Sequence, residues 1–444
     1  MRVNIKKLLI IGIGLVLIWF IVSYSSVIEL SKSIPNDHNL LEIENRIEHL
    51  EKRIEGRLSE SNSLLEKVKK HLKRTEENYH GDAKDSGYDR NFMPNTANVV
   101  LPVLLIACDR VTVRRCLDNL VKFRPDKNTF PIIVSQDCGH NATYQVIKSF
   151  TDTDPSITVV QQPDTSEIPL PRAKVKFRGY YKIARHYKFA LNHVFNTLGH
   201  EAVIIVEDDL DISQDFFEYF RGTYSLLLKD SSLWCISAWN DNGKKEVIDM
   251  SRPELLHRTD FFPGLGWTLR RDTWLELEPR WPEAFFDDWL RNPENTHGRA
   301  CIRPEISRTF TFGKIGVSKG LFYDMHLRAM QLNVDYVEFT KMNLTYLLKE
   351  NYDESLTSTV YALPEWTADE VVSLPVGGDP PAVRVSYSNA KTYQKAAKKL
   401  GLMDDFRSGV PRTAYRGVVS CFVRGRRVWV APRDPWRGYD PSWG

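Results

Sequence analysis

The spacing of hydrophobic positions divides the chain into three parts, and the first is an apolar run near the N-terminus. Residues 8–22 carry no charge, and the run of low polarity continues to residue 28. A run of this length is sufficient to cross a bilayer as one helix. Basic residues precede it and acidic residues follow it, so the positive-inside rule predicts a cytoplasmic tail at 1–7 and a luminal or extracellular remainder. We interpret 8–28 as an uncleaved anchor, with a signal peptide cleaved near Ser25 as the alternative.

The second part, at 29–97, predicts a helical stem followed by a linker. From about residue 40 to 70 the apolar side chains recur at steps of three and four, and charged residues fill the other faces. Such a helix could pair with a copy of itself as a short coiled coil, or it could be a solvated charged spacer. Residues 71–97 show neither period nor apolar content, which is typical of a linker.

In the third part, from about Asn98, short apolar runs alternate with helical patterns. Four runs have the length and composition of buried strands, and apolar residues between 183 and 198 recur with the period of a helix. The same pattern leaves His186 outside this apolar stripe. The alternation predicts an α/β domain over 98–313 with a largely parallel sheet and helical crossovers. The predicted strands are 98–107, 129–135, 157–161 and 202–206.

Charged residues follow these predicted strands directly. Parallel sheets bind ligands at the carboxyl ends of their strands, so this edge is the predicted binding site. The residues that fall there are Asp109, Arg110, Asp137, Asp208 and Asp209.

The acidic run Glu207-Asp208-Asp209 is the first feature with chemical meaning. Carboxylates gathered at the tip of an apolar strand repel one another, and hard divalent cations with oxygen ligands are their usual partners. The run therefore indicates a metal that also holds the phosphates of a ligand. The alternative is that these acids favour the positive end of a following helix, which could start at Asp211 or near Ser213.

A second acidic pair lies among aromatic residues at 281–290. Asp287 and Asp288 stand between Phe286 and Trp289, and aromatic faces beside carboxylates suit a sugar. The other interpretation is the start of an amphipathic helix. One of the two carboxylates could act as a general base, and spacing does not choose between them.

Composition narrows the class of protein. The 444 residues are 42% hydrophobic and 26% charged, with a net charge of +3, which excludes disorder throughout and gives no reason to expect a nucleic-acid partner. Sequons at Asn141 and Asn343 and six cysteines, taken together with the apolar run, favour an oxidising lumen. No Cys-x-x-Cys pair, Walker loop, Gly-x-Ser-x-Gly elbow or His-Glu-x-x-His motif occurs in the sequence.

In these and further residues, the sequence resembles the N-acetylglucosaminyltransferase I family of Golgi enzymes. The resemblance covers about 101–429 and runs through many long blocks in order. The blocks are Ala107–Leu117, Ser135–Asp137, Tyr180–Lys188, Ile205–Asp209, Trp239–Gly243, Arg258–Trp267, Asp287–Arg291, Arg303–Thr309 and Gly409–Gly417.

The resemblance implies a single-pass type II protein of the Golgi membrane with a luminal catalytic part. It implies a GT-A nucleotide-sugar-binding domain with a mixed, largely parallel sheet at 98–313, a linker with a donor-closing loop at 314–349, and a smaller β-rich domain at 350–444. In that family Mn²⁺ and UDP-GlcNAc bind, and GlcNAc passes with inversion to O2 of the α1,3-linked mannose of a five-mannose N-glycan. This step starts the synthesis of hybrid and complex N-glycans on glycoproteins.

Two other functions are compatible with the same resemblance. One is a related β1,2-GlcNAc transferase that acts on O-linked mannose, although 29–97 is too short and charged for the extra sugar-binding domain of such relatives. The other is a catalytically inactive paralogue that binds glycans.

Site residues follow from the resemblance by position. The base corresponds to Asp287 and the metal ligand to Asp209, while Ser318 matches a contact in the loop that closes over the donor. Phe286 departs from the family, which has Trp immediately before the base. The remaining donor-binding positions fall on Arg110, Asp137 and Asp208 (uridine and phosphates), Glu207 and Leu265 (the donor sugar) and His186.

The resemblance also implies two disulfides. It pairs Cys108 with Cys138 and Cys235 with Cys301. Cys116 and Cys421 would stay unpaired.

Overall fold

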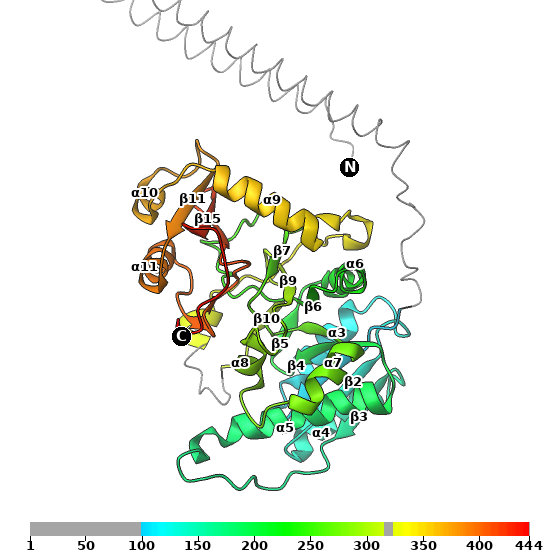
Figure 1. Cartoon of the computed structure of the whole chain (residues 1–444). Coiled ribbons are helices and arrows are strands. Elements are labelled where there is room, and N and C mark those ends of the chain that lie inside the picture. Colours follow the sequence, from blue (N-terminus) through cyan, green and yellow to red (C-terminus); the bar gives the residue numbers. More distant parts are fainter. Residues whose placement is uncertain (1–98, 315–322, 444) are drawn as a thin grey trace, which may run out of the picture. The chain divides into compact units, whose positions relative to one another are not determined.

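The computed structural model describes residues 99–314 and 323–443. The predicted anchor at 8–28 and the stem at 29–97 lie outside the described residues. Within the described ranges, no helix combines the length and the apolar character that a bilayer span requires. The ranges belong to one compact unit, 93–444, whose strands and helices are drawn in Figure 1.

An eight-stranded mixed sheet organises the first part of this unit. Its order is β3-β2-β1-β4-β8-β6-β9-β7. The first four strands run parallel, whereas β8 and β7 are antiparallel to their neighbours. The prediction of a mixed α/β sheet is confirmed. The strands are β1 Val103–Ala107, β2 Ile132–Gln136, β3 Ile157–Gln161, β4 Ala202–Glu207, β6 Leu233–Ser237, β7 Leu256–Thr259, β8 Trp267–Arg270 and β9 Ala300–Pro304.

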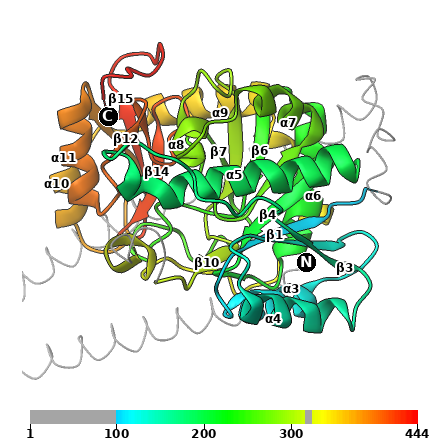
Figure 2. The ribbon, with the colours of Figure 1, turned by 90° about the horizontal axis from the view of Figure 1, so that it is seen from below.

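Successive residues of the central strands face opposite layers of helix. On β1, Val103 and Leu105 belong to a core formed with α3 and α6, while Leu104 packs into a second core with α5 and α7. Figure 2 shows β1 and β4 between α5 on one side and α3 and α4 on the other. The helices are α3 Val113–Phe123, α4 Asn141–Thr151, α5 Arg178–Asn192, α6 Phe216–Lys229, α7 Arg271–Leu277 and α8 Phe286–Arg291.

All four predicted strands are present, and two of them end one residue later than predicted. The strand at 157–161 is found unchanged, and that at 202–206 gains one residue. The first two begin later than predicted, immediately after Pro102 and Pro131. Proline has no N–H to donate to a ladder, so it delays the start of a strand.

Short elements complete the sheet domain. A two-stranded ladder joins β5 (Leu210–Ile212) to β10 (Thr309–Thr311) in antiparallel register, directly after the acidic tip of β4. Helix α5 continues into a π-helical turn at His193–Thr197. The other short turns are Val175–Phe177, Glu278–Arg280, Tyr323–Leu327, Phe339–Lys341 and Thr345–Leu347.

The C-terminal part is mixed rather than β-rich. A three-stranded sheet, β11-β15-β14, packs against α10 and α11 around a separate apolar core. Helices cover more of 350–444 than strands do, so the prediction of a β-rich domain is wrong in this respect. The resemblance implied a β-rich domain here, but stretches such as 390–400 have the apolar period of a helix and form helices. The elements are α9 Lys349–Ala362, α10 Ala368–Ser373, α11 Ala390–Leu400, β11 Ala382–Tyr387, β12 Phe406–Arg407, β13 Val410–Pro411, β14 Val419–Val423 and β15 Arg426–Pro432.

Candidate active site

The carboxyl ends of β1, β2 and β4 bring the predicted charged residues to one edge of the sheet. Arg110 follows β1, and its guanidinium lies 3.0 Å from Asp208 Oδ1 and 2.5 Å from Asp209 Oδ2. Asp137 follows β2 and is buried, and its N–H donates to the carbonyl of Ala107 (2.9 Å). This shared position is what the strand pattern predicts, while the binding roles of these residues stay predictions.

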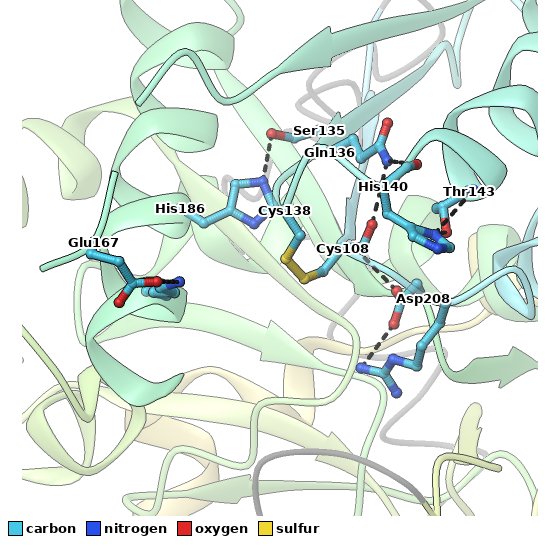
Figure 3. Close-up of a disulfide and its surroundings, with 11 residues drawn as sticks. Cys108, Ser135, Gln136, Cys138, His140, Thr143, Glu167, His186 and Asp208 are labelled. Atoms are coloured by element: carbon cyan, nitrogen blue, oxygen red, sulfur yellow. Dashed lines mark hydrogen bonds and ion pairs between the residues drawn. A yellow bond between two sulfur atoms is a disulfide. The ribbon is translucent and has the colours of Figure 1, made fainter. Parts of the chain in front are cut away.

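A disulfide fastens two of these strand ends together. Cys108 after β1 and Cys138 after β2 are bridged, and Cys138 adopts a left-handed backbone conformation with φ of 71°. Figure 3 shows the bridge beside Asp208, whose Oδ2 accepts from the N–H of Cys108 (3.3 Å). The disulfide therefore restrains the loop that carries Arg110.

The second disulfide lies within the sheet. Cys235 on β6 pairs in register with Cys301 on the parallel neighbour β9, and the two are bridged. Cys116 and Cys421 are free and buried. Both pairings implied by the resemblance are thus confirmed.

The acidic tip of β4 carries more negative charge than its neighbours neutralise. Burial raises the pKa of Glu207 to about 7, and repulsion from Asp209 adds to the shift. Burial also raises the pKa of Asp208 to about 7, against the opposing attraction of Arg110. One arginine for three successive acids leaves a site that a cation would stabilise.

Asp209 fits the role of an oxygen ligand to a hard cation. Its carboxylate is partly exposed and faces Gly313, where a Cβ would lie only 2.0 Å from Oδ2. The carboxylate thus occupies the volume that a side chain at 313 would need. Within 99–314 and 323–443, no three His, Cys, Asp or Glu side chains are grouped to hold a metal ion. A cation bound at Asp209 would therefore take further oxygen ligands from elsewhere, such as the phosphates of a nucleotide.

His186 occupies a buried position beside this edge. It is 3% exposed, and its Nε2 lies 2.9 Å from Ser135 Oγ at the end of β2, as Figure 3 shows. Burial lowers the pKa of His186 to about 4, although Asp137 opposes the shift. His186 lies outside the apolar stripe predicted for its helix, but it is buried all the same because this side of α5 faces the end of β2. The imidazole is therefore neutral at pH 7 and can exchange hydrogen bonds without adding charge.

A tight loop places Leu265 two residues before β8, the antiparallel neighbour of β4. Leu265 has φ of 48°, between glycines at 264 and 266 that also have positive φ. Thr309 Oγ1 donates to the carbonyl of Leu265 (2.6 Å), and a Cβ on Gly266 would lie 2.7 Å from Thr309 Cγ2. The positive φ at 264 and 266 is the reason for both glycines, and the contact with the Thr309 side chain is a second reason at Gly266.

Helix α8 presents the second acidic pair, and the two carboxylates have different partners. Arg291 NH1 lies 2.8 Å from Asp287 Oδ2 and 2.9 Å from Asp288 Oδ1. Asp288 also accepts from Nε of Arg407 on β12, at 3.1 Å. Asp288 thus contacts two arginines and Asp287 contacts one, which leaves Asp287 the less engaged of the two carboxylates. The acids do lie in the first turn of a helix, as the alternative interpretation held.

Tyr187 of α5 links α8 to the acidic tip of β4. Its hydroxyl donates to Glu207 Oε1 (2.7 Å), and its ring packs against Phe286 with centroids 4.2 Å apart. Phe286 also stacks on Trp281 at 5.4 Å, so it is a buried part of the core. The proposed base is therefore held at a fixed position relative to the strand tip.

Three residues that contact the candidate site were not indicated by the sequence, and one predicted site residue lies outside the described ranges. Tyr187 belongs to the apolar stripe of its helix, so its periodicity predicts core packing and gives no sign of the bond to Glu207. Arg407 and Gly313 contact Asp288 and Asp209 across long sequence separations, so the sequence alone gives no sign of these contacts. Ser318 lies outside the described residues.

Comparisons with known proteins agree with one another on the family. The model of the GNT-I family matches residues 4–443. An alpha-1,3-mannosyl-glycoprotein 2-beta-N-acetylglucosaminyltransferase from Arabidopsis thaliana is 38% identical over 339 residues, which cover 76% of this chain and 74% of the plant protein.

Solved structures give only weak likenesses. The mannosyltransferase PcManGT from Pyrobaculum calidifontis, in complex with GDP-Man and Mn²⁺, is 15% identical with a TM-score of 0.28, over 41% of this chain and 48% of its own. TarS 1-349 from S. aureus is 12% identical with a TM-score of 0.31, over 67% of this chain and 80% of its own. Similarities this low do not identify a family, so the family assignment rests on the family model and on the plant relative.

Proposed function

The chain belongs to the GNT-I family, and from this premise we propose that it transfers GlcNAc from UDP-GlcNAc, with inversion, to O2 of the α1,3-linked mannose of a five-mannose N-glycan. The observation that carries the proposal is the family match across 4–443. The geometry supports it with a phosphate-compatible strand edge that Tyr187 links to a helix bearing a candidate base.

The donor half of the site is the edge formed by β1, β2 and β4. Arg110 is the cation on this edge, and binding of a nucleoside diphosphate would let it exchange a carboxylate partner for a phosphate oxygen. Buried Asp137 and Asp208 are suited to accept hydrogen bonds from the uridine. The neutral imidazole of His186 adds a polar contact without repelling Arg110.

The edge also fits a metal. Asp209 is the residue that would hold Mn²⁺, which when bound neutralises the negative charge that develops on a departing diphosphate. Glu207, fixed by Tyr187, is placed to face the sugar of the donor rather than the cation.

The acceptor half of the site is the first turn of α8. Asp287 accepts the proton of the mannose O2 hydroxyl as that oxygen bonds to C1 of GlcNAc and the bond from C1 to the diphosphate oxygen breaks. Attack from the face opposite to the leaving group inverts the configuration at C1, so the protein needs no nucleophile of its own. Arg291 holds the carboxylate in a fixed orientation before the acceptor binds.

The disulfides and the exposed sequons support a Golgi location, with the catalytic part in the lumen and the anchor at 8–28. Two disulfides require an oxidising compartment. The asparagines of both sequons, Asn141 and Asn343, are exposed and accessible for glycosylation. The mixed sheet with its ligand edge at the carboxyl ends of parallel strands is consistent with a GT-A domain.

The test is transfer by the full-length chain. The purified protein is incubated with UDP-GlcNAc, Mn²⁺ and a five-mannose N-glycan, and the product is analysed by mass spectrometry and NMR. One added HexNAc in β1,2-linkage, lost in EDTA, is the expected result. A folded protein that binds UDP but adds no sugar would contradict the proposal, and transfer to an O-mannosyl peptide alone would reassign the acceptor.

A further inference from the structure

A cavity of about 520 Å³ lies between the segment that follows α8 and the C-terminal tail. Figures 1 and 2 both show the red C-terminal segment near α8. The volume falls within the range of about 300–1,000 Å³ that is common for small-molecule sites. The residues that line it include Asp260, Asn292, Ser408, Tyr415, Trp436 and Tyr439, together with the cations Arg258, Arg299, Lys349 and Arg416.

The cavity lies next to the acceptor half of the proposed site, because two of its lining residues are close in sequence to that half. Asn292 caps the C-terminal end of α8, five residues after Asp287, which corresponds to roughly 8 Å along a helix axis. On the other wall, Ser408 directly follows Arg407, whose side chain bonds to Asp288. A chain of sugar rings that begins at Asp287 could therefore extend into the cavity.

The wall has the chemistry of a carbohydrate site. Trp436 and Tyr439 have ring centroids 5.4 Å apart, and the guanidinium of Arg416 lies 5.8 Å from Trp436 and 5.9 Å from Tyr415. Aromatic faces of this kind stack on the CH faces of sugars. Beside them, Asp260 Oδ2 accepts from Tyr439 OH (2.6 Å) and from the N–H of Arg416 (2.7 Å). Both bonds end on one oxygen, so the other can accept from a sugar hydroxyl.

The charges around the cavity favour a neutral ligand over an anion. Arg416 and Lys349 both pair with Asp353, at 2.7 and 2.6 Å. Arg258 pairs with Asp230 at 2.7 Å, and Arg299 pairs with Glu276 at 2.6 Å. Because each of these cations already has a carboxylate, the cavity offers hydroxyl partners without a strong positive field.

We propose that this cavity is a subsite for the sugar rings of the acceptor glycan that lie beyond the mannose receiving GlcNAc. The inference rests on the proposed function, since it extends the acceptor half of that site. Its consequence is selectivity for a branched N-glycan over a short mannoside, supplied by the C-terminal tail.

The experiment compares two acceptors with the full-length chain and the variant Trp436→Ala. Trp436 is 36% exposed, so its truncation spares the core. We expect the KM for the five-mannose N-glycan to rise about tenfold, equivalent to about 1.4 kcal/mol of binding. The KM for a mannosyl-α1,3-mannoside and both kcat values should stay within twofold of wild type. Trp436→Phe, which keeps an aromatic face, should restore most of the affinity.

A matched control is Tyr336→Ala, which truncates an exposed aromatic side chain (57% exposed) that does not line the cavity. It should change neither KM. An unchanged KM for the long acceptor in Trp436→Ala, or equal losses on both acceptors, would overturn the subsite. Failure of the wild-type protein to modify either acceptor would instead refute the proposed function.

Discussion

The substitution Gly313→Ala is a direct probe of the proposed metal ligand, because it adds one methyl group at the site of Asp209. The new Cβ would lie 2.0 Å from Asp209 Oδ2 and 2.6 Å from its Cγ. Ordinary van der Waals contact begins at 3.4 Å, so the carboxylate has to retreat by the difference, about 1.4 Å. A displacement of about 1 Å at a reacting centre can cost about 100-fold in rate.

We therefore expect kcat/KM for GlcNAc transfer to fall about 100-fold in Gly313→Ala. The Mn²⁺ concentration needed for half-maximal activity should rise as well, since the displaced carboxylate binds the cation less well. The assay is initial-rate transfer to the five-mannose N-glycan across a Mn²⁺ titration. Stability, measured by urea denaturation, should fall by about 1–3 kcal/mol, the usual cost of overpacking.

Gly222→Ala is the matched control, because it makes the same chemical change with a similar overlap elsewhere. Its Cβ would lie 2.5 Å from Phe339 Cβ, on α6 and away from the acidic tip. This variant should lose stability but keep the transfer rate of its folded fraction. The reasoning is refuted if Gly313→Ala retains wild-type kcat/KM and wild-type Mn²⁺ dependence while it stays folded.

Two further predictions concern stability. Replacing both Cys235 and Cys301 by alanine removes a bridge that spans 66 residues of sequence, and urea denaturation should show a loss of about 4 kcal/mol; a loss below about 1 kcal/mol would contradict this estimate. Burial lowers the pKa values of His186 and His257 to about 4. Below pH 6.5 the unfolded chain therefore binds protons on these two imidazoles that the folded chain does not bind. The contribution of each histidine to stability should be complete above pH 6.5 and fall by roughly 3 kcal/mol as the pH drops to 4. Glu207 and Asp208, whose pKa values are raised, contribute with the opposite sign over this range, so the two imidazoles are followed individually by NMR titration. An imidazole that titrates at about 6.5 would contradict its burial in the neutral form.

The four strands of the parallel half of the sheet were predictable because they are short apolar runs that end in polar residues, whereas β6, β7, β8 and β9 were not predicted. The strand at 157–161 and the acidic tip after 202–206 follow from that pattern alone. The delayed starts at 103 and 132 reflect the prolines that precede them. Local composition thus carries most of the information about this half of the fold.

The chemistry of α8 was less predictable because its contacts join distant segments. The sequence shows two adjacent acids, and only the resemblance favours Asp287. In the structure, Arg407 lies 119 residues after Asp288 and bonds to it, which distinguishes the two carboxylates physically. The burial of His186 likewise depends on how α5 meets the strand ends, and helical periodicity does not encode that contact.

At position 286 the resemblance predicts Trp, and the protein has Phe, which is part of the packed core. Phe286 lies between Tyr187 and Trp281 and is 7% exposed, so the ring still supports the first turn of α8. What is lost is an indole N–H that could donate a hydrogen bond. Orientation of the base in this protein therefore depends on aromatic packing and on Arg291.

The most direct test of the account is to measure transfer and UDP binding together in Asp287→Asn, with Asp288→Asn as its matched control. An amide at 287 keeps the shape of the carboxylate but removes its basicity, and general-base catalysis contributes about 10²–10⁴-fold. The account predicts a loss of kcat of that size in Asp287→Asn, with UDP affinity unchanged, and a loss of less than about tenfold in Asp288→Asn. Equal losses in the two variants, or full activity in Asp287→Asn, would contradict the assignment of the base.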